Sequence, residues 1–171
     1  MISILRLGHR IGRDARLSTH CGLAARALGA DEITYSGEED KELIESVKDT
    51  AKRWGGSFCV RYANNWQSVI KNYKKKKFCA VHLTMYGMPL QKKISTLRKK
   101  KNILLIVGSG KVPGEVYGLA DFNIAVTSQP HSEVAAMSIF LHEYFRGREL
   151  DKRFGNAKIR IKPQERGKKF G

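Results

Sequence analysis

The chain has 171 residues, of which 42% are hydrophobic, and a formal net charge of +16 from 32 Lys and Arg against 16 Asp and Glu. A chain of this size buries a core without disulfide or metal staples, and no segment approaches the roughly 18 apolar residues of a membrane-spanning helix. These features argue against a disulfide scaffold and a membrane-spanning protein. The positive charge favours a polyanionic partner, with nucleic acid ahead of an anionic membrane surface.

The N-terminus and the cysteines indicate the same compartment. The first residues, MISILRLGHR, carry their charges after the apolar run and lack a small-residue cleavage site, so we interpret them as a strand and not as a signal peptide. Cys21, Cys59 and Cys79 lie far apart and form no CxxC pair, as is typical of reduced thiols in a cytosolic protein. We therefore expect a cytoplasmic protein.

Short β-rich runs alternate with helical patterns as far as residue 146. In chain order the sequence predicts a strand at 2–7, a helix at 17–30, a strand at 32–36, a helix at 40–56, a strand at 57–63, a short helix at 65–73, a strand at 78–84, a helix at 89–101, a strand at 102–108, a connection at 112–121, a strand at 122–127 and a helix at 132–146. In the first helix Ser18 or Thr19 lies near the expected start, and Gly29 is the expected stop. Six strands that alternate with helices predict an α/β fold with a parallel sheet flanked by helices.

The end of the chain has a different composition. Residues 1–150 are expected to form one domain, and residues 151–171 a basic C-terminal extension with eight Lys or Arg among its last twenty residues. Because KIRIK alternates like a strand, both a tail and a small added hairpin remain open.

Three consecutive strand ends carry polar and small residues. YGM follows the fourth strand, GSGKVPG the fifth and TSQPHS the sixth. Ligands of parallel α/β sheets bind beyond the carboxyl ends of the strands. In the last of these loops Ser132 is placed to cap the following helix, Glu133 complements its dipole and Pro130 stiffens the entry, so the loop is both a helix start and a candidate wall of a binding site.

Several familiar chemistries do not fit. GSGK lacks the earlier glycine of a phosphate-binding loop, because Leu105 stands there, and Val112 replaces the Ser or Thr that follows the lysine. No GxGxxG follows the first strand, the five histidines have no metal-ligand spacing, and no Ser-His-Asp order is apparent. The glycine turn is therefore either an ordinary connection or a place where the backbone approaches a ligand.

Basic residues gather in three runs, at 71–77, at 92–101 and in the extension, which favours a polyanion bound through its phosphates. Tyr73 and Tyr86 are candidates for stacking on bases and equally for packing. Arg10, Arg13 and Arg16 follow the first strand, where their forked donors suit phosphate. Arg26 lies on a mostly apolar helix surface, either as a functional residue or as a structural salt-bridge partner.

The predicted last helix, VAAMSIFLHEYF, is apolar on almost every side. Such a helix is buried on most faces, either within its own chain or against a second subunit. We expect a homodimer that pairs through this helix.

Three segments resemble the motifs of the SPOUT methyltransferases, in the TrmH-like branch: HCGLAARALGA at 20–30, LLIVGSGKVPGEVYGLAD at 104–121 and FNIAVTSQPHSEVAA at 122–136. The segments LRLGHRIGRDARLSTH, VHLTMYG and ADFNIAVTSQPHSEVAA are more specifically similar to the family of archaeal tRNA (cytidine-56) 2′-O-methyltransferases, and this resemblance covers most of residues 4–146. One departure is Gly110, where the family loop often carries an acidic residue.

The resemblance implies a C-terminal trefoil knot, a homodimer, tRNA as substrate and S-adenosylmethionine as methyl donor, with no metal. It implies Arg26 as the catalytic residue and Arg10, Arg13 and Arg16 as RNA-binding residues. It places the cofactor against Leu83, Thr84, Tyr86, Gly87, Gly108, Ser109, Gly110, Lys111, Val112, Val126, Thr127, Ser128, Gln129, Pro130, His131, Ser132 and Glu133. The alternative is a non-catalytic RNA-binding protein, such as a ribosome-associated factor, which the charge fits equally well.

Overall fold

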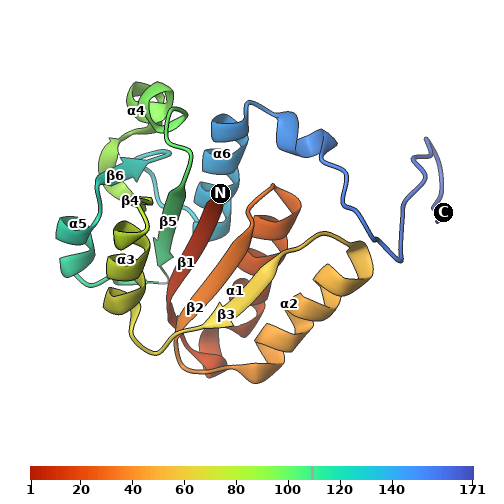
Figure 1. Ribbon diagram of the computed structural model, residues 1–171, viewed down its shortest axis with the longest axis horizontal. Helices are drawn as coiled ribbons and strands as arrows, with labels where there is room; N and C mark the ends of the chain where they lie inside the picture. Colours follow the sequence, from red (N-terminus) through yellow and green to blue (C-terminus); the bar gives the residue numbers. More distant parts are fainter. Residues whose placement is uncertain (109) are drawn as a thin grey trace.

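A computed structural model describes residues 1–108 and 110–171. Six parallel strands form one sheet in the order β3-β2-β1-β5-β4-β6 (Figure 1). The strands are β1 (Ile2–His9), β2 (Glu32–Gly37), β3 (Cys59–Tyr62), β4 (Cys79–Pro89), β5 (Ile103–Gly108) and β6 (Phe122–Ala125). The predicted parallel α/β sheet is confirmed, whereas the strand order does not test the knot, which stays a prediction.

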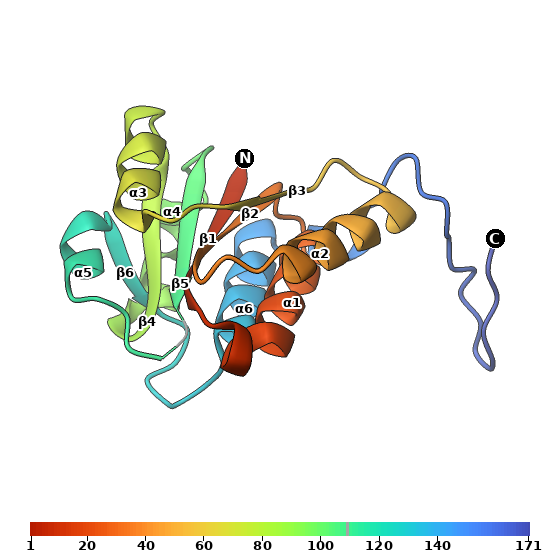
Figure 2. The same ribbon diagram turned by 90° about the horizontal axis from the view of Figure 1, so that it is seen from below.

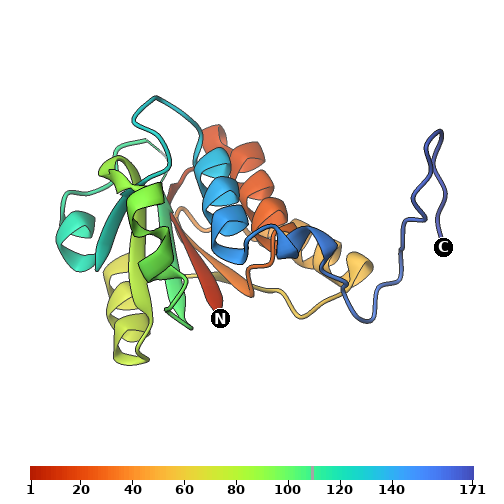
Figure 3. The same cartoon turned by 90° about the horizontal axis from the view of Figure 1, so that it is seen from above.

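Helices cover both faces of the sheet (Figures 2 and 3). The helices are α1 (Ile11–Ala27), α2 (Lys41–Trp54), α3 (Trp66–Lys75), α4 (Leu90–Leu97), α5 (Glu115–Leu119) and α6 (Glu133–Phe145), with a 3-10 turn, η1, at Arg148–Asp151. Side chains of α1, α2, α4 and α6 pack in the larger core cluster, while α3 and α5 contribute to the smaller one. Because β5 is buried on both faces, its run ILLIV is continuously apolar, as expected for a central parallel strand.

The first helix begins six residues earlier than the sequence predicts. The expected local cap, Ser18 or Thr19, lies inside α1, and the helix begins after Arg10, whose side chain makes no capping bond. Instead, the carboxylate of Glu38 accepts a hydrogen bond from the Ile11 backbone N–H at 2.7 Å. The cap comes from a residue 27 positions away, which local spacing rules do not detect. The predicted stop at Gly29 is confirmed by its left-handed backbone, with φ of +93°.

Two other boundaries differ. β4 continues to Pro89, five residues beyond the predicted end, and α5 forms a short helix where only a connection was expected.

The extension after η1 runs along the end of α2, where the Gly56 N–H donates to the Gly155 carbonyl at 2.9 Å and the Lys158 N–H to the Arg53 carbonyl at 2.9 Å. Its last residues turn back through an isolated antiparallel bridge between Ile161 and Phe170, and KIRIK does not join the sheet.

Candidate cofactor pocket and the arginine cluster beside it

A cavity of about 520 Å³ lies at the carboxyl ends of β4, β5 and β6, where α6 begins. The parallel sheet brings together three loops that are far apart in the sequence, as the strand-end argument predicts. Most of the predicted cofactor residues line it, namely Leu83, Thr84, Tyr86, Gly108, Gly110, Lys111, Val112, Val126, Pro130, His131, Ser132 and Glu133. Its volume falls within the roughly 300–1,000 Å³ typical of small-molecule sites.

An irregularity in β4 shapes one wall. Leu83 and Met88 both pair with Ile124 of β6, so the four residues between them leave the strand register. Gly87 lies so close to β6 that a Cβ there would overlap the backbone of Asn123 and Ile124. The Thr84 hydroxyl is hydrogen-bonded to the Tyr117 hydroxyl at 2.9 Å, which ties this wall to α5.

The last loop forms the opposite wall and starts α6. The Ser132 hydroxyl accepts the Ala135 N–H at 3.2 Å, which confirms the predicted cap. Glu133 lies in the first turn and lines the pocket, with its side chain only 10% exposed.

Some predicted cofactor residues do not line the pocket. Thr127, Ser128 and Gln129 are exposed beside it, Gly87 acts through its close approach to β6, and Ser109 lies outside the described residues. Met85, within the range Leu83–Gly87 that the resemblance places against the cofactor, also lines it, whereas the sequence reasoning missed His82, Val107, Tyr117, Ile124 and Ala136. Most of these belong to buried apolar patterns, which predict a core and not a pocket.

The two tyrosines that were candidates for base stacking differ in exposure. Tyr86 is 79% exposed at the rim, whereas Tyr73 packs against Phe78 and donates to Glu32, so of the two only Tyr86 remains available for stacking.

His82 is a buried polar residue in the pocket lining. The Asn123 amide donates to the Tyr117 carbonyl at 3.0 Å, so its oxygen faces His82 Nδ1 at 2.9 Å. Nδ1 must therefore carry the proton, which leaves Nε2 as an acceptor, and Nε2 has no partner within the described residues. Burial lowers the pKa of His82, which keeps the ring neutral.

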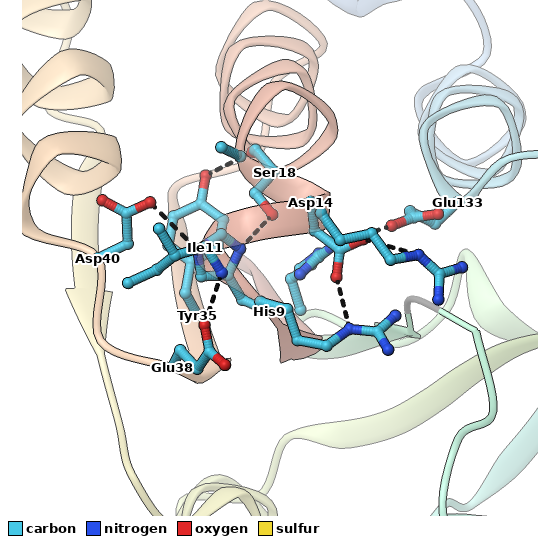
Figure 4. Close-up of polar contacts among 12 residues, drawn as sticks. His9, Ile11, Asp14, Ser18, Tyr35, Glu38, Asp40 and Glu133 are labelled. Carbon is cyan, nitrogen blue, oxygen red and sulfur yellow. Dashed lines mark hydrogen bonds and ion pairs between the residues drawn. The ribbon is translucent and has the colours of Figure 1, made fainter.

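A cluster of buried charges joins the pocket wall to the β1–α1 segment (Figure 4). Arg6 of β1 is fully buried, and its Nη2 lies 3.2 Å from Glu133 and 3.9 Å from Asp14. Asp14, which is also buried, accepts a hydrogen bond from Arg10 at 3.2 Å and lies 3.9 Å from Arg13. One carboxylate therefore holds two of the predicted RNA-binding arginines.

The β1–α1 turn is fixed from its other side (Figure 4). His9 Nδ1 lies 2.8 Å from the Ser18 hydroxyl, and Nε2 lies 3.2 Å from Asp40, which also caps α2. Ser18 is fully buried, so this Ser-His-Asp arrangement holds structure and offers no accessible nucleophile.

A second hollow of about 560 Å³ adjoins the first and shares Gly110 and Lys111 with it. Arg10 and Arg13 line this second hollow, and their side chains are 44% and 68% exposed. Arg16 is exposed on α1 but lines neither hollow.

The structure does not bring Arg26 to the pocket within one chain. Arg26 lies in the last turn of α1, at the opposite end of the helix from Arg10. It is 7% exposed, and its Nη2 donates to the Gly55 carbonyl at 2.6 Å. Its Cζ lies over the Phe154 ring of the extension, 4.5 Å from the ring centroid. Burial lowers the pKa of its guanidinium. In this position Arg26 anchors the extension, and its catalytic role stays a prediction.

Within residues 1–108 and 110–171 no group of three His, Cys, Asp or Glu side chains could hold a metal ion. No helix in this part of the chain is long and apolar enough to cross a membrane.

The buried thiol of Cys21 is unreactive. Burial, followed by the charge of Glu133, raises its pKa to about 12.

Comparison with solved structures shows which class of proteins shares this fold. The fold resembles a TrmH/SpoU tRNA modifying enzyme of A. aeolicus, with a TM-score of 0.65 and 18% identity, over 88% of this chain and 76% of that one. It also resembles the SpoU methyltransferase AviRb of Streptomyces viridochromogenes, determined in complex with AdoMet, with a TM-score of 0.63 and 15% identity, over 86% of this chain and 57% of that one. The fold is therefore that of the SpoU/TrmH methyltransferases.

The sequence comparisons define the family. A family model described as tRNA ribose 2′-O-methyltransferase, aTrm56, matches residues 54–171. The tRNA (cytidine(56)-2′-O)-methyltransferase of Methanopyrus kandleri is 49% identical over 97% of this chain and 93% of its own length. That of Pyrococcus horikoshii is 50% identical over 99% of this chain and 84% of its own length. This chain belongs to the aTrm56 family of tRNA ribose 2′-O-methyltransferases.

Proposed function

We propose that this protein transfers a methyl group from S-adenosylmethionine to the ribose 2′-hydroxyl of cytidine 56 in tRNA. The observation that carries the proposal is family membership at about half identity over nearly the whole chain. The geometry supports it, because three segments that resemble the family, VHLTMYG and the segments at 104–121 and 122–136, contribute residues to one pocket.

The pocket has the features that an adenosine-containing cofactor requires. Apolar walls from Leu83, Val107 and Ile124 suit a purine. When bound, S-adenosylmethionine supplies an electrophilic methyl on a sulfonium. Transfer of this methyl to the 2′-oxygen would break the sulfur–carbon bond and release the hydroxyl proton to solvent, leaving 2′-O-methylribose and S-adenosylhomocysteine.

The chain's contribution is positioning. The adjoining hollow, with Arg10, Arg13 and Lys111, would hold the phosphates that flank the target ribose. Asp14 orients both arginines, and Arg6 links Asp14 to the wall of the cofactor pocket. A hydroxyl held in line with the methyl reacts faster because its orientation is already fixed.

The assembly and the compartment are part of the same proposal. Ile139 of α6 is 44% exposed and Leu150 just beyond it 65% exposed, which favours a homodimer through this surface. A tRNA substrate favours the cytoplasm. We retain residues 151–171 as an extension of a single domain at 1–150.

The test is tritium transfer from labelled S-adenosylmethionine to an unmodified tRNA transcript, with the product nucleotide mapped by mass spectrometry. We expect one methyl group on the ribose of cytidine 56. No incorporation into any RNA by a folded protein would reject the enzyme. If calorimetry then also showed no heat with S-adenosylmethionine, the non-catalytic RNA-binding alternative would stand.

A further inference from the structure

Two lysine-rich turns lie at the amino edge of the sheet, the edge at which the parallel strands begin. Lys74 to Lys77 end α3 just before β4, and Arg98 to Lys101 follow α4 just before β5. Figure 2 shows this end of the sheet, with the N-terminus, opposite the loops that follow β5 and β6.

Backbone contacts join the two turns into one surface. The Cys79 N–H donates to the Asn102 carbonyl at 2.9 Å, and the Ile103 N–H donates to the Met1 carbonyl at 3.0 Å. The ammonium group of Met1 donates to the Lys101 carbonyl at 2.7 Å, which adds another positive charge. Burial raises the pKa of Cys79, and the charges of Lys100 and Lys74 oppose this rise, so one lysine from each turn lies near the same thiol.

The positive charge of this surface is poorly compensated. Between Asp49 and Glu115 the chain has fifteen Lys or Arg and no Asp or Glu. Lys74 pairs with Asp121, and Arg98 with Glu143. In the part of the chain that the structure describes, no ion pair within 4.0 Å is formed by the exposed residues Lys75, Lys76, Lys77, Lys99, Lys100 and Lys101. We call these six residues the amino-edge patch. Like charges gathered in this way repel one another unless a polyanion binds them.

The patch is remote from the candidate chemistry. β5 runs from Ile103 beside the patch to Gly108 in the cofactor pocket, a length of roughly 17 Å at about 3.3 Å per residue. A ribose held at the pocket therefore cannot place its own phosphate on the patch, because adjacent phosphates lie much closer to the ribose. Any phosphates bound there belong to another part of the RNA.

We propose that the amino-edge patch is a second docking surface, which binds the sugar–phosphate backbone of tRNA away from the methylated nucleotide. The inference rests on the proposed function for the identity of the RNA. An anionic lipid surface is the less favoured partner, because neither turn contributes a large apolar side chain exposed in the described structure and Met1, which is 52% exposed, is the one such side chain whose residue is hydrogen-bonded to a turn, whereas membrane-surface segments combine charge with several apolar anchors. Phosphate contacts of this kind add affinity without reading sequence.

The test compares two triple variants of the full chain that carry the same charge change. The patch variant is Lys75→Gln/Lys99→Gln/Lys101→Gln. The control is Lys41→Gln/Lys48→Gln/Lys52→Gln, which removes three exposed lysines from α2. Binding without cofactor is measured by fluorescence anisotropy over a series of salt concentrations, with a full-length tRNA transcript, a T-arm minihelix and vesicles that contain anionic lipid.

We expect the patch variant to raise the Kd for full-length tRNA on the order of tenfold and to flatten the slope of log K against log salt by about two to three. The minihelix Kd, the Kd for S-adenosylmethionine and kcat at saturating tRNA should stay as in the wild type, and the control variant should bind full-length tRNA nearly normally.

Three results would overturn the proposal: an unchanged Kd for full-length tRNA, an equal loss for the control variant, or a loss confined to the anionic vesicles. Since binding is measured without methyl transfer, the two proposals fail separately. A wild type that binds tRNA through the patch but transfers no methyl rejects only the enzyme. A patch variant that binds tRNA normally while the wild type methylates it rejects only the docking surface.

Discussion

At the scale of single residues, a few buried charged and polar side chains shape the candidate site. Arg6, Asp14 and Glu133 connect the candidate cofactor pocket to the arginines of the β1–α1 segment, while His82 belongs to the pocket lining and keeps a buried nitrogen, Nε2, that has no partner within the described residues. Arg26, for which the resemblance implies a catalytic role, is buried away from the pocket of its own chain and packs against the Phe154 ring. Each of these placements can be tested by one substitution.

Replacing Arg26 separates its two candidate roles. Arg26→Met removes the hydrogen bond to Gly55 and the contact with the Phe154 ring, so the structural role alone predicts a loss of about 1–3 kcal/mol in the free energy of unfolding with kcat unchanged. Urea denaturation and single-turnover kinetics measure the two quantities. A large fall in kcat with normal stability would support the catalytic role that the resemblance implies. Phe154→Ala, which removes only the ring, is the matched variant.

Breaking the Arg6–Glu133 pair should be costly. Arg6→Met leaves the carboxylates of Glu133 and Asp14 without this buried cation, and loss of one partner of a buried pair costs about 3–5 kcal/mol. Chemical denaturation of Arg6→Met, Glu133→Gln and the double variant gives the coupling. The double variant should be more stable than the sum of the single losses predicts, and strict additivity would show that the pair does not interact.

His82 makes stability depend on pH. Because its pKa is lowered in the fold, the unfolded chain binds a proton at higher pH than the folded chain does. The contribution of the neutral ring is complete above the ordinary pKa of 6.5 and is lost as the pH falls toward the lower folded value. His82→Asn should therefore show a smaller loss of unfolding free energy between pH 7.5 and pH 5 than the wild type. A His82→Asn variant that loses as much unfolding free energy over this pH range as the wild type would contradict the assignment.

At the scale of elements, close approach and long-range capping decide where the loops lie. α1 begins at Ile11 because Glu38 caps it from the loop after β2, and β4 leaves its register between Leu83 and Met88 to form a pocket wall. Neither feature has a local sequence signal, since the interacting groups are far apart in the chain.

Gly87 allows this register change. Gly87→Ala would push a methyl group into the backbone of β6, so we expect a destabilisation of about 1–3 kcal/mol together with weaker S-adenosylmethionine binding. Gly118→Ala in α5 meets no atom within 4 Å and should be neutral or stabilising by up to about 1 kcal/mol. Thermal unfolding measures the stability of the two variants, and calorimetry measures their binding of S-adenosylmethionine. Equal effects of the two substitutions would contradict the close approach of Gly87 to β6.

At the scale of the whole molecule, function is divided between the two edges of the sheet. The carboxyl edge holds the pocket and the arginine cluster, whereas the amino edge holds the two lysine-rich turns and the start of the extension along α2. A long polyanion such as tRNA can reach both edges of a domain of this size. The exposed side of α6 is a third surface, and the one for which we propose a second subunit.

The proposed dimer is tested through Ile139. Ile139→Lys adds a charge to an apolar side chain that is already half-exposed in the single chain, so the fold should persist while self-association weakens. Analytical ultracentrifugation of wild type and variant should show a dimer and a monomer. A monomeric wild type would reject the dimer, and an unchanged dimer in the variant would place the interface elsewhere.

The sequence by itself determined the alternation of strands and helices, the buried central strand, the cap at Ser132 and the three loops that line the pocket, because each depends on residues close together in the chain. It also carried the family resemblance. Only the tertiary structure decided that α1 begins at Ile11, that His82 joins the pocket lining, that Arg6 pairs with Glu133 and that Arg26 lies away from the pocket of its own chain. These depend on which side chains the sheet order and helix packing bring together, and local patterns do not encode those distances. The structure likewise showed that lysines separated by some twenty residues share one edge, because parallel strands return the chain to the same side of the sheet.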